Sequence, residues 1–87
     1  MTDKKIEKEV QEIQDFEESY QELLIKIGKN LNAHRTLAGL TLEETSQKIN
    51  IQKDMLENVE KGRNIDYSLG LLLKLSMIYG IDLAQVF

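Results

Sequence analysis

Cysteine, proline and tryptophan are absent from this chain of 87 residues, and glycine occurs only five times. Without cysteine there is no disulfide framework and no thiolate metal site, which fits a reducing cytoplasm. No apolar run approaches the length of a membrane span, and no hydrophobic stretch follows a basic start, so neither a membrane helix nor a secretory signal is expected. We expect one small, soluble, cytoplasmic domain whose helices must pack efficiently to bury a modest core.

The residue patterns of catalysis and cofactor binding are also missing. The single histidine, His34, has no acid or nucleophile at helical spacing, and the nearby glutamates are better explained as helix-end and surface charges. The chain has no phosphate-cradling glycine loop and no paired histidines at metal-ligand spacing. We therefore expect no enzyme activity, no cofactor and no metal.

Charge is distributed unevenly along the chain, although the formal net charge is only −4. Residues 1 to 22 carry three lysines against eight carboxylates, a balance of −5, which leaves +1 for residues 23 to 87. A nucleic-acid partner usually requires a basic surface. The second segment is therefore the one in which such a surface is expected.

Residues 40 to 62 predict two short helices joined by a tight turn. Thr41 and Glu44 have the spacing of a capping box, in which each side chain satisfies a free backbone N–H of the first helix. Asn50 tolerates the left-handed backbone that a sharp corner requires, so it is expected to end that helix. The second helix runs from about Lys53 to Lys61 and is ended by Gly62.

Two further helices are expected around this pair. The first spans residues 23 to 38, and the other runs from Leu69 to Tyr79 after an N-cap at Ser68 and ends at Gly80. A final short helix opens at Asp82. The matching residues along these elements are Ile27, Gly28, Leu31, Arg35, Gly39, Leu40, Thr41, Glu43, Glu44, Ser46, Ile49, Asn50, Ile51, Leu56, Val59, Glu60, Gly62, Arg63, Leu72, Leu73, Lys74, Leu75, Gly80, Ile81, Val86 and Phe87.

Their joint order and spacing resembles the Cro-like helix-turn-helix family, the lambda-repressor-like DNA-binding domains. This resemblance implies an all-α, five-helix bundle over residues 23 to 87. It also implies that Arg35 pairs with Glu60, which would tie the first helix to the recognition helix. Bases in the major groove would be met by Gln52, Lys53, Asp54 and Asn58, and the DNA backbone by Thr41, Lys48, Lys61, Arg63 and Asn64.

Two departures from the family pattern support an alternative. Many relatives carry glutamine at the position of Leu42, where it reaches the phosphate backbone, and leucine cannot do so. Asp54 and Glu57 would repel phosphates unless each finds a base amino group or a lysine partner. The alternative hypothesis is therefore a protein-interaction module, an antirepressor or adaptor, that has the fold but does not bind DNA.

Residues 1 to 22 lie outside the resemblance and predict an extra amphipathic helix with an acidic surface. Its apolar residues recur at helical spacing. This arm either continues into the next helix or breaks at a second capping-box spacing, Ser19 to Glu22. We expect the stripe to be docked, either on its own bundle or on a partner subunit. The stripe consists of Ile6, Val10, Ile13, Phe16 and Tyr20.

The helix over residues 69 to 79 has more apolar residues than one buried face accounts for. Leu71 and Met77 are therefore candidates for contact with the arm, in the same subunit or across a two-fold axis. Four cations near the recognition helix can neutralise about three or four phosphates per subunit, so DNA binding implies a homodimer. The sequence predicts a repressor acting on a short operator, and it leaves phage repressors, plasmid repressors and antitoxins open.

Overall fold

The computed structural model describes the backbone of residues 2 to 63 and 66 to 87, and the side chains of this range from residue 11 onward. The elements are helices α1 (Thr2–Leu37), α2 (Leu42–Ile49), α3 (Lys53–Glu60) and α4 (Leu69–Tyr79), followed by a 3-10 turn η1 (Leu83–Val86). No strand occurs in the described ranges. The all-α prediction is therefore confirmed. The predicted count of five bundle helices plus a separate N-terminal helix is not, because the described chain has four α-helices and one 3-10 turn.

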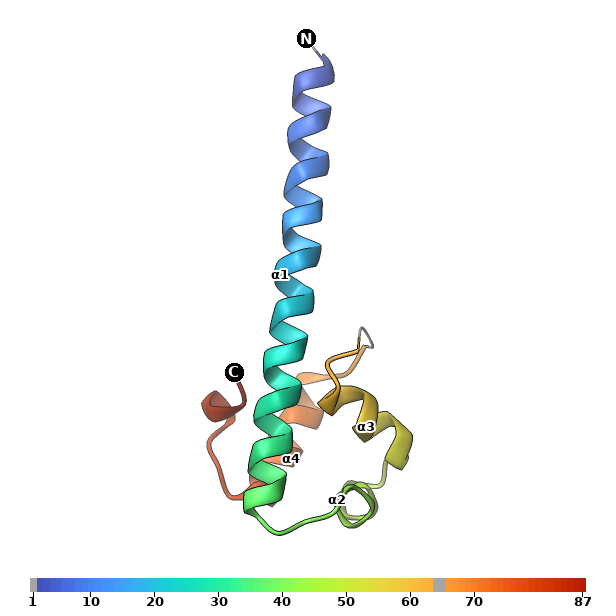
Figure 1. Ribbon diagram of the computed structural model, residues 1–87, viewed down its shortest axis with the longest axis vertical. Coiled ribbons are helices and arrows are strands. Elements are labelled where there is room, and N and C mark those ends of the chain that lie inside the picture. Colours follow the sequence, from blue (N-terminus) through green and yellow to red (C-terminus); the bar gives the residue numbers. More distant parts are fainter. Residues whose placement is uncertain (1, 64–65) are drawn as a thin grey trace.

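The predicted N-terminal arm is the first half of one long helix. α1 runs without interruption from Thr2 to Leu37, so the break considered at Ser19 is absent. The arm projects away from the other helices, which gather around the second half of α1 (Figure 1). Ile13 and Phe16 are 59% and 67% exposed. The hypothesis that the arm covers α4 within the same chain is therefore wrong in this structure.

The core forms where the second half of α1 meets α3, α4 and η1. Every helix that surrounds it contributes apolar side chains, and burial of each leucine or valine stabilises the fold by roughly 1.5 to 3 kcal/mol. Contacts between residues far apart in the chain therefore hold the bundle together. The apolar side chains with essentially no exposed surface are Leu31, Leu56, Val59, Leu75 and Val86.

Local sequence signals set the ends of the short helices. The Thr41 hydroxyl accepts a hydrogen bond from the Glu44 backbone at 3.0 Å, and the Glu44 carboxylate accepts one from the Thr41 backbone at 3.3 Å. This confirms the predicted capping box. Asn50 adopts the left-handed conformation at φ 56°, as predicted. Ser68 caps α4 by accepting a hydrogen bond from the Leu71 backbone at 3.1 Å. Each such cap is worth roughly 0.5 to 2 kcal/mol.

The surplus of apolar residues on α4 is divided between the core and the surface. Leu71 is buried in the chain's own core, so the prediction that it contacts the arm is wrong in this structure. Met77 is 72% exposed and, together with Leu69 and Leu73, forms an uncovered row at four-residue spacing. These three exposed residues confirm the prediction that α4 has more apolar side chains than one buried face can hold.

Tyr79 makes the stability of the bundle sensitive to high pH. Burial raises the pKa of its hydroxyl to about 12, above the 10.0 of an exposed tyrosine. The unfolded chain therefore ionises first, so the stabilisation is complete below pH 10 and is lost as the pH rises toward 12. We expect the free energy of unfolding to fall by on the order of 2 kcal/mol over that window. Denaturant titrations at several pH values measure this loss, and an equally steep fall in Tyr79→Phe would contradict the assignment.

Candidate nucleic-acid interface

Helix α3 is anchored by one face and presents the opposite face to solvent. Leu56 and Val59 are fully buried against the core, and they fix the rotation of α3 about its own axis. Gln52 forms the N-cap of α3 without a side-chain cap hydrogen bond, and Lys53 and Asp54 occupy its first turn. All three are exposed. The structure therefore brings three of the four predicted base-contacting residues together at the open N-terminal end of one helix.

The fourth predicted base-contacting residue, Asn58, lies about one helical turn further along α3 and is half-buried. Its side-chain oxygen accepts a hydrogen bond from Nη1 of Arg63 at 2.8 Å. The resemblance implies that Asn58 contacts a base and that Arg63 contacts the DNA backbone. In this structure they are bonded to each other, a contact five residues apart that spans the end of α3.

The predicted backbone-contacting residues are spread more widely. Thr41 lies at the start of α2, where it lines an open hollow of about 370 Å³ together with Lys53 and Leu42. Lys48 lies in the last turn of α2 and lines a different hollow, of about 330 Å³, with Met77 of α4. Thr41 and Lys53 therefore share one hollow, whereas Lys48 belongs to another. Asn64 lies outside the described residues.

Glu57, which would repel phosphates if it were unpaired, forms an ion pair with a lysine. Its carboxylate lies 2.9 Å from the ammonium group of Lys61, four residues on. The hydrogen bond from Lys61 lowers the pKa of Glu57, so the carboxylate stays ionised and paired. Asp54 makes no ion pair among the described residues. The repulsion expected between Glu57 and phosphates is thus reduced by this ion pair. In the same conformation, however, Lys61 is not free to bind a phosphate.

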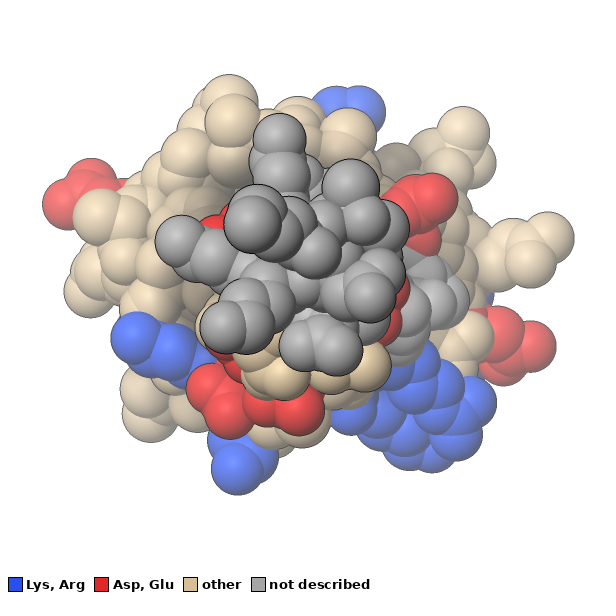
Figure 2. All heavy atoms as spheres, turned by 90° about the horizontal axis from the view of Figure 1, so that it is seen from above, with Lys and Arg blue, Asp and Glu red and all other residues tan. Residues whose placement is uncertain are grey.

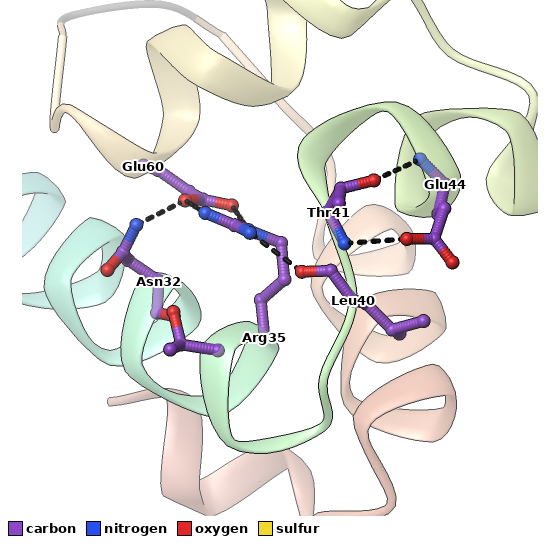
Figure 3. Close-up of polar contacts among 7 residues, drawn as sticks. Asn32, Arg35, Leu40, Thr41, Glu44 and Glu60 are labelled. Atoms are coloured by element: carbon purple, nitrogen blue, oxygen red, sulfur yellow. Dashed lines mark hydrogen bonds and ion pairs between the residues drawn. The ribbon is translucent and has the colours of Figure 1, made fainter.

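Arg35 and Glu60 form the ion pair that the resemblance implied, between α1 and the end of α3 (Figure 3). Nε and Nη2 of Arg35 donate to the two carboxylate oxygens at 2.8 and 3.0 Å. The side chains are only 13% and 5% exposed. Hydrogen bonding to Glu60 raises the pKa of Arg35, so its guanidinium remains charged throughout the physiological range.

Two further partners, which the sequence did not single out, complete this network. Nδ2 of Asn32 donates to Glu60 at 2.7 Å, and Nη1 of Arg35 donates to the backbone carbonyl of Leu40 at 2.8 Å. Asn32 lies three residues before Arg35 on the same face of α1, which is a spacing that predicts a shared contact. Higher on α1, Gln21 donates to the carbonyl of Gly62 at 2.9 Å. These bonds fix both the axis and the end of α3 relative to α1.

The molecule is not uniformly charged around its circumference. In the view from the N-terminal end, lysine and arginine side chains gather at the lower right, and carboxylates are scattered elsewhere (Figure 2). That is the side of the molecule on which α3 lies in Figure 1. A basic region on this side of the molecule attracts phosphate groups.

Other kinds of site find little support in the described part of the chain. There, no three histidine or carboxylate side chains are grouped as metal ligands would be. Within the same residues, no helix is long and apolar enough to cross a membrane. The exposed start of α3, with the hollow beside it, is the surface on which the predicted base-contacting residues Gln52, Lys53 and Asp54 lie.

Two short helices, a turn at Asn50 and an exposed, braced second helix define a helix-turn-helix protein. A solved structure that matches the chain is the high-resolution crystal structure of the restriction-modification controller protein C.AhdI from Aeromonas hydrophila. It is 30% identical in sequence, the TM-score is 0.67, and the match covers 74% of this chain and 96% of that chain. The chain belongs to the helix-turn-helix family that includes this controller protein. No family model and no curated protein matches it.

Proposed function

We propose that this protein is a transcriptional regulator that binds double-stranded DNA sequence-specifically as a homodimer. The observation that carries the proposal is the position of α3, whose first turn is exposed while its far end is held by the buried Arg35–Glu60 pair. A helix supported in this way can enter the major groove without losing its orientation. The likeness to a restriction-modification controller protein supports a regulatory role.

The side chains at the start of α3 suit base recognition. Lys53 can donate to O6 and N7 of guanine, Gln52 can make a paired contact with adenine, and Asp54 can accept from N4 of cytosine. Thr41, beside the hollow that it shares with Lys53, would face the DNA backbone. For Lys61 to contact DNA, its ion pair with Glu57 must break. For Arg63 and Asn58 to contact DNA, the hydrogen bond between them must break.

Two copies acting together follow from the small number of free cations. Lys61 is paired with Glu57, and Arg63 is bonded to Asn58. A single subunit would thus neutralise few phosphates, whereas a dimer doubles that number on adjacent half-sites. Repression by occupying a promoter is the simplest mode of action for such a dimer.

The internal pairing of this surface also favours a second candidate, a protein-interaction module that does not bind DNA. Both the Glu57–Lys61 and Asn58–Arg63 contacts satisfy groups that a DNA-binding surface would offer to phosphates and bases. The acidic first half of α1 would then serve a basic partner. One experiment separates the two candidates.

We expect the affinity for pooled duplex DNA, measured by fluorescence anisotropy, to fall steeply with salt. Replacing Lys53 and Arg63 with Ala should reduce the slope of log K against log salt by about 3 to 4, because each of the two subunits loses two cations that displace counterions from DNA. The matched control replaces Lys26 and Lys29, which are exposed on α1, and should leave the slope unchanged. A folded protein that shows no binding even at low salt would favour the protein-interaction module.

A further inference from the structure

Two open hollows lie next to each other along α4, with volumes of about 230 and 330 Å³. Ile49 of α2 and Lys74 of α4 line both of them, so the two hollows adjoin and form one depression, the α4 groove. Gly70 leaves the first hollow unfilled, because it has no side chain and a Cβ added there would meet only the Ser68 hydroxyl, at 3.5 Å. Met77 lines the second hollow and is exposed. The groove is therefore an open and mostly apolar surface.

The charged residues that line the α4 groove are both lysines, Lys48 and Lys74. Their side chains are exposed, and neither forms an ion pair with the residues whose side chains the structure describes. The groove thus carries two positive charges in a chain whose formal net charge is −4. An apolar groove of this kind is complementary to an amphipathic helix that has carboxylates beside its apolar side chains.

The first half of α1 is such a helix. Ile13 and Phe16 are exposed and Tyr20 is half-buried, and they follow one another at positions i, i+3 and i+7, a spacing with which a helix occupies a groove. At about 100° per residue, Glu12 lies about 40° beyond Phe16 on one side of this row, and Glu17 lies about 40° beyond Ile13 on the other. Both carboxylates are exposed and form no ion pair within the described part of the chain. The arm therefore matches the groove in both apolar surface and charge.

The arm cannot occupy the groove of its own chain, because α1 is one uninterrupted helix whose first half projects away from α4 (Figure 1). We propose that the first half of α1 in one copy docks in the α4 groove of a second copy. The apolar row of the arm then covers the two hollows, and the carboxylates of Glu12 and Glu17 pair with the ammonium groups of the groove. Every copy has one arm and one groove, so a mutual exchange of arms closes the assembly as a dimer.

The inference rests on the homodimer of the proposed function and names the surface that joins its two copies. The start of α3 stays accessible, because Gln52, Lys53 and Asp54 do not line the groove. Lys48 binds a carboxylate of the second copy in place of the DNA phosphate that the resemblance implied. Association is measured without DNA, and DNA binding is measured by its salt dependence. Failure of this contact and failure of the regulatory function are therefore separately observable.

The first test measures the mass of the full chain without DNA by sedimentation equilibrium. We expect a dimer, because each copy presents both surfaces. The dissociation constant should rise roughly tenfold or more when the arm loses its apolar contacts in Ile13→Ser with Phe16→Ser. It should rise by a similar factor when the groove reverses its charge in Lys48→Glu with Lys74→Glu. A monomeric wild-type chain overturns the proposal, and so does a groove variant that associates as tightly as the wild type.

Two control variants alter exposed residues outside both surfaces. Leu69→Ser with Leu73→Ser removes apolar surface from α4 beside the groove, and Lys26→Glu with Lys29→Glu reverses two exposed charges on α1. Both should associate like the wild type. If the Leu69 and Leu73 variant dissociates the dimer while the arm variant does not, the two copies meet through α4 alone and the proposal is overturned.

The second test mixes two variants that should each be monomeric alone. Lys48→Glu with Lys74→Glu gives an acidic groove that repels its own acidic arm, and Glu12→Lys with Glu17→Lys gives a basic arm that repels its own basic groove. In the mixture, each arm meets a groove of opposite charge. We expect a heterodimer with a dissociation constant within about threefold of the wild-type value. Two folded variants that remain monomeric when mixed would overturn the exchange of arms.

Discussion

Replacing Arg35 with Ala should lower the free energy of unfolding by about 3 to 5 kcal/mol, because it leaves the Glu60 carboxylate buried without its cation. The Glu60 side chain is only 5% exposed and accepts hydrogen bonds from Nε and Nη2 of Arg35. Asn32 would remain as a neutral donor to Glu60 and cannot balance its charge. Urea denaturation followed by circular dichroism measures this loss.

The matched double variant, Arg35→Leu with Glu60→Leu, removes both charges and should recover most of the lost stability, since buried ion pairs are often replaced by apolar side chains without cost. Arg35→Lys should fall between the two, because an ammonium group cannot donate to both carboxylate oxygens and to the Leu40 carbonyl with the same geometry. If Arg35→Ala unfolds at the same urea concentration as the wild type, the pair does not stabilise the fold. Any loss of DNA binding in Arg35→Ala should follow the loss of folded protein.

Gly28→Ala should be about as damaging, although alanine is the better helix former. An added Cβ at this position would lie 2.5 Å from the backbone oxygen of Glu60 and 2.6 Å from that of Val59. Neither atom can move unless α3 shifts away from α1. Because the two helices must move apart, we expect the free energy of unfolding to fall by about 3 kcal/mol or more, which exceeds the usual cost of an overpacked core.

Gly39→Ala is the control for the Gly28 variant. Gly39 has φ +72°, and no atom lies within 4 Å of an added Cβ, so its replacement costs only the left-handed strain of about 1 to 2 kcal/mol. The two variants thus separate steric contact from backbone strain. If Gly28→Ala is no less stable than Gly39→Ala, α1 and α3 are not held at their contact distance. In the DNA-binding assay, a folded Gly28→Ala protein should also show weaker sequence preference, since α3 would be displaced.

Both predictions concern the contact between α1 and α3, and this contact links stability to the proposed function. Arg35, Asn32 and Gly28 all lie on the second half of α1 and all act on the C-terminal end of α3. The opposite end of α3 carries the exposed residues proposed to read DNA. The fold therefore fixes one end of the helix and leaves the other free for a ligand.

The sequence by itself determined where the short helices begin and end. Thr41 with Glu44, Asn50, Ser68 and Gly80 each act through bonds to residues at most four positions away. Such signals are complete within a short stretch of chain, so they can be recognised without knowing the fold. The Arg35–Glu60 pair is different, because it was anticipated through resemblance to a family and not from any local pattern.

The tertiary structure alone decided which apolar side chains are buried and which polar side chains are bonded to other residues of the chain. Leu71 and Met77 lie on the same helix with similar side chains, yet one is buried and the other exposed, because only Leu71 belongs to the core cluster. The course of the arm was open in the sequence, since its apolar period fits both a docked helix and a straight continuation. These outcomes depend on contacts between residues dozens of positions apart, and their free energies are not encoded in any local spacing.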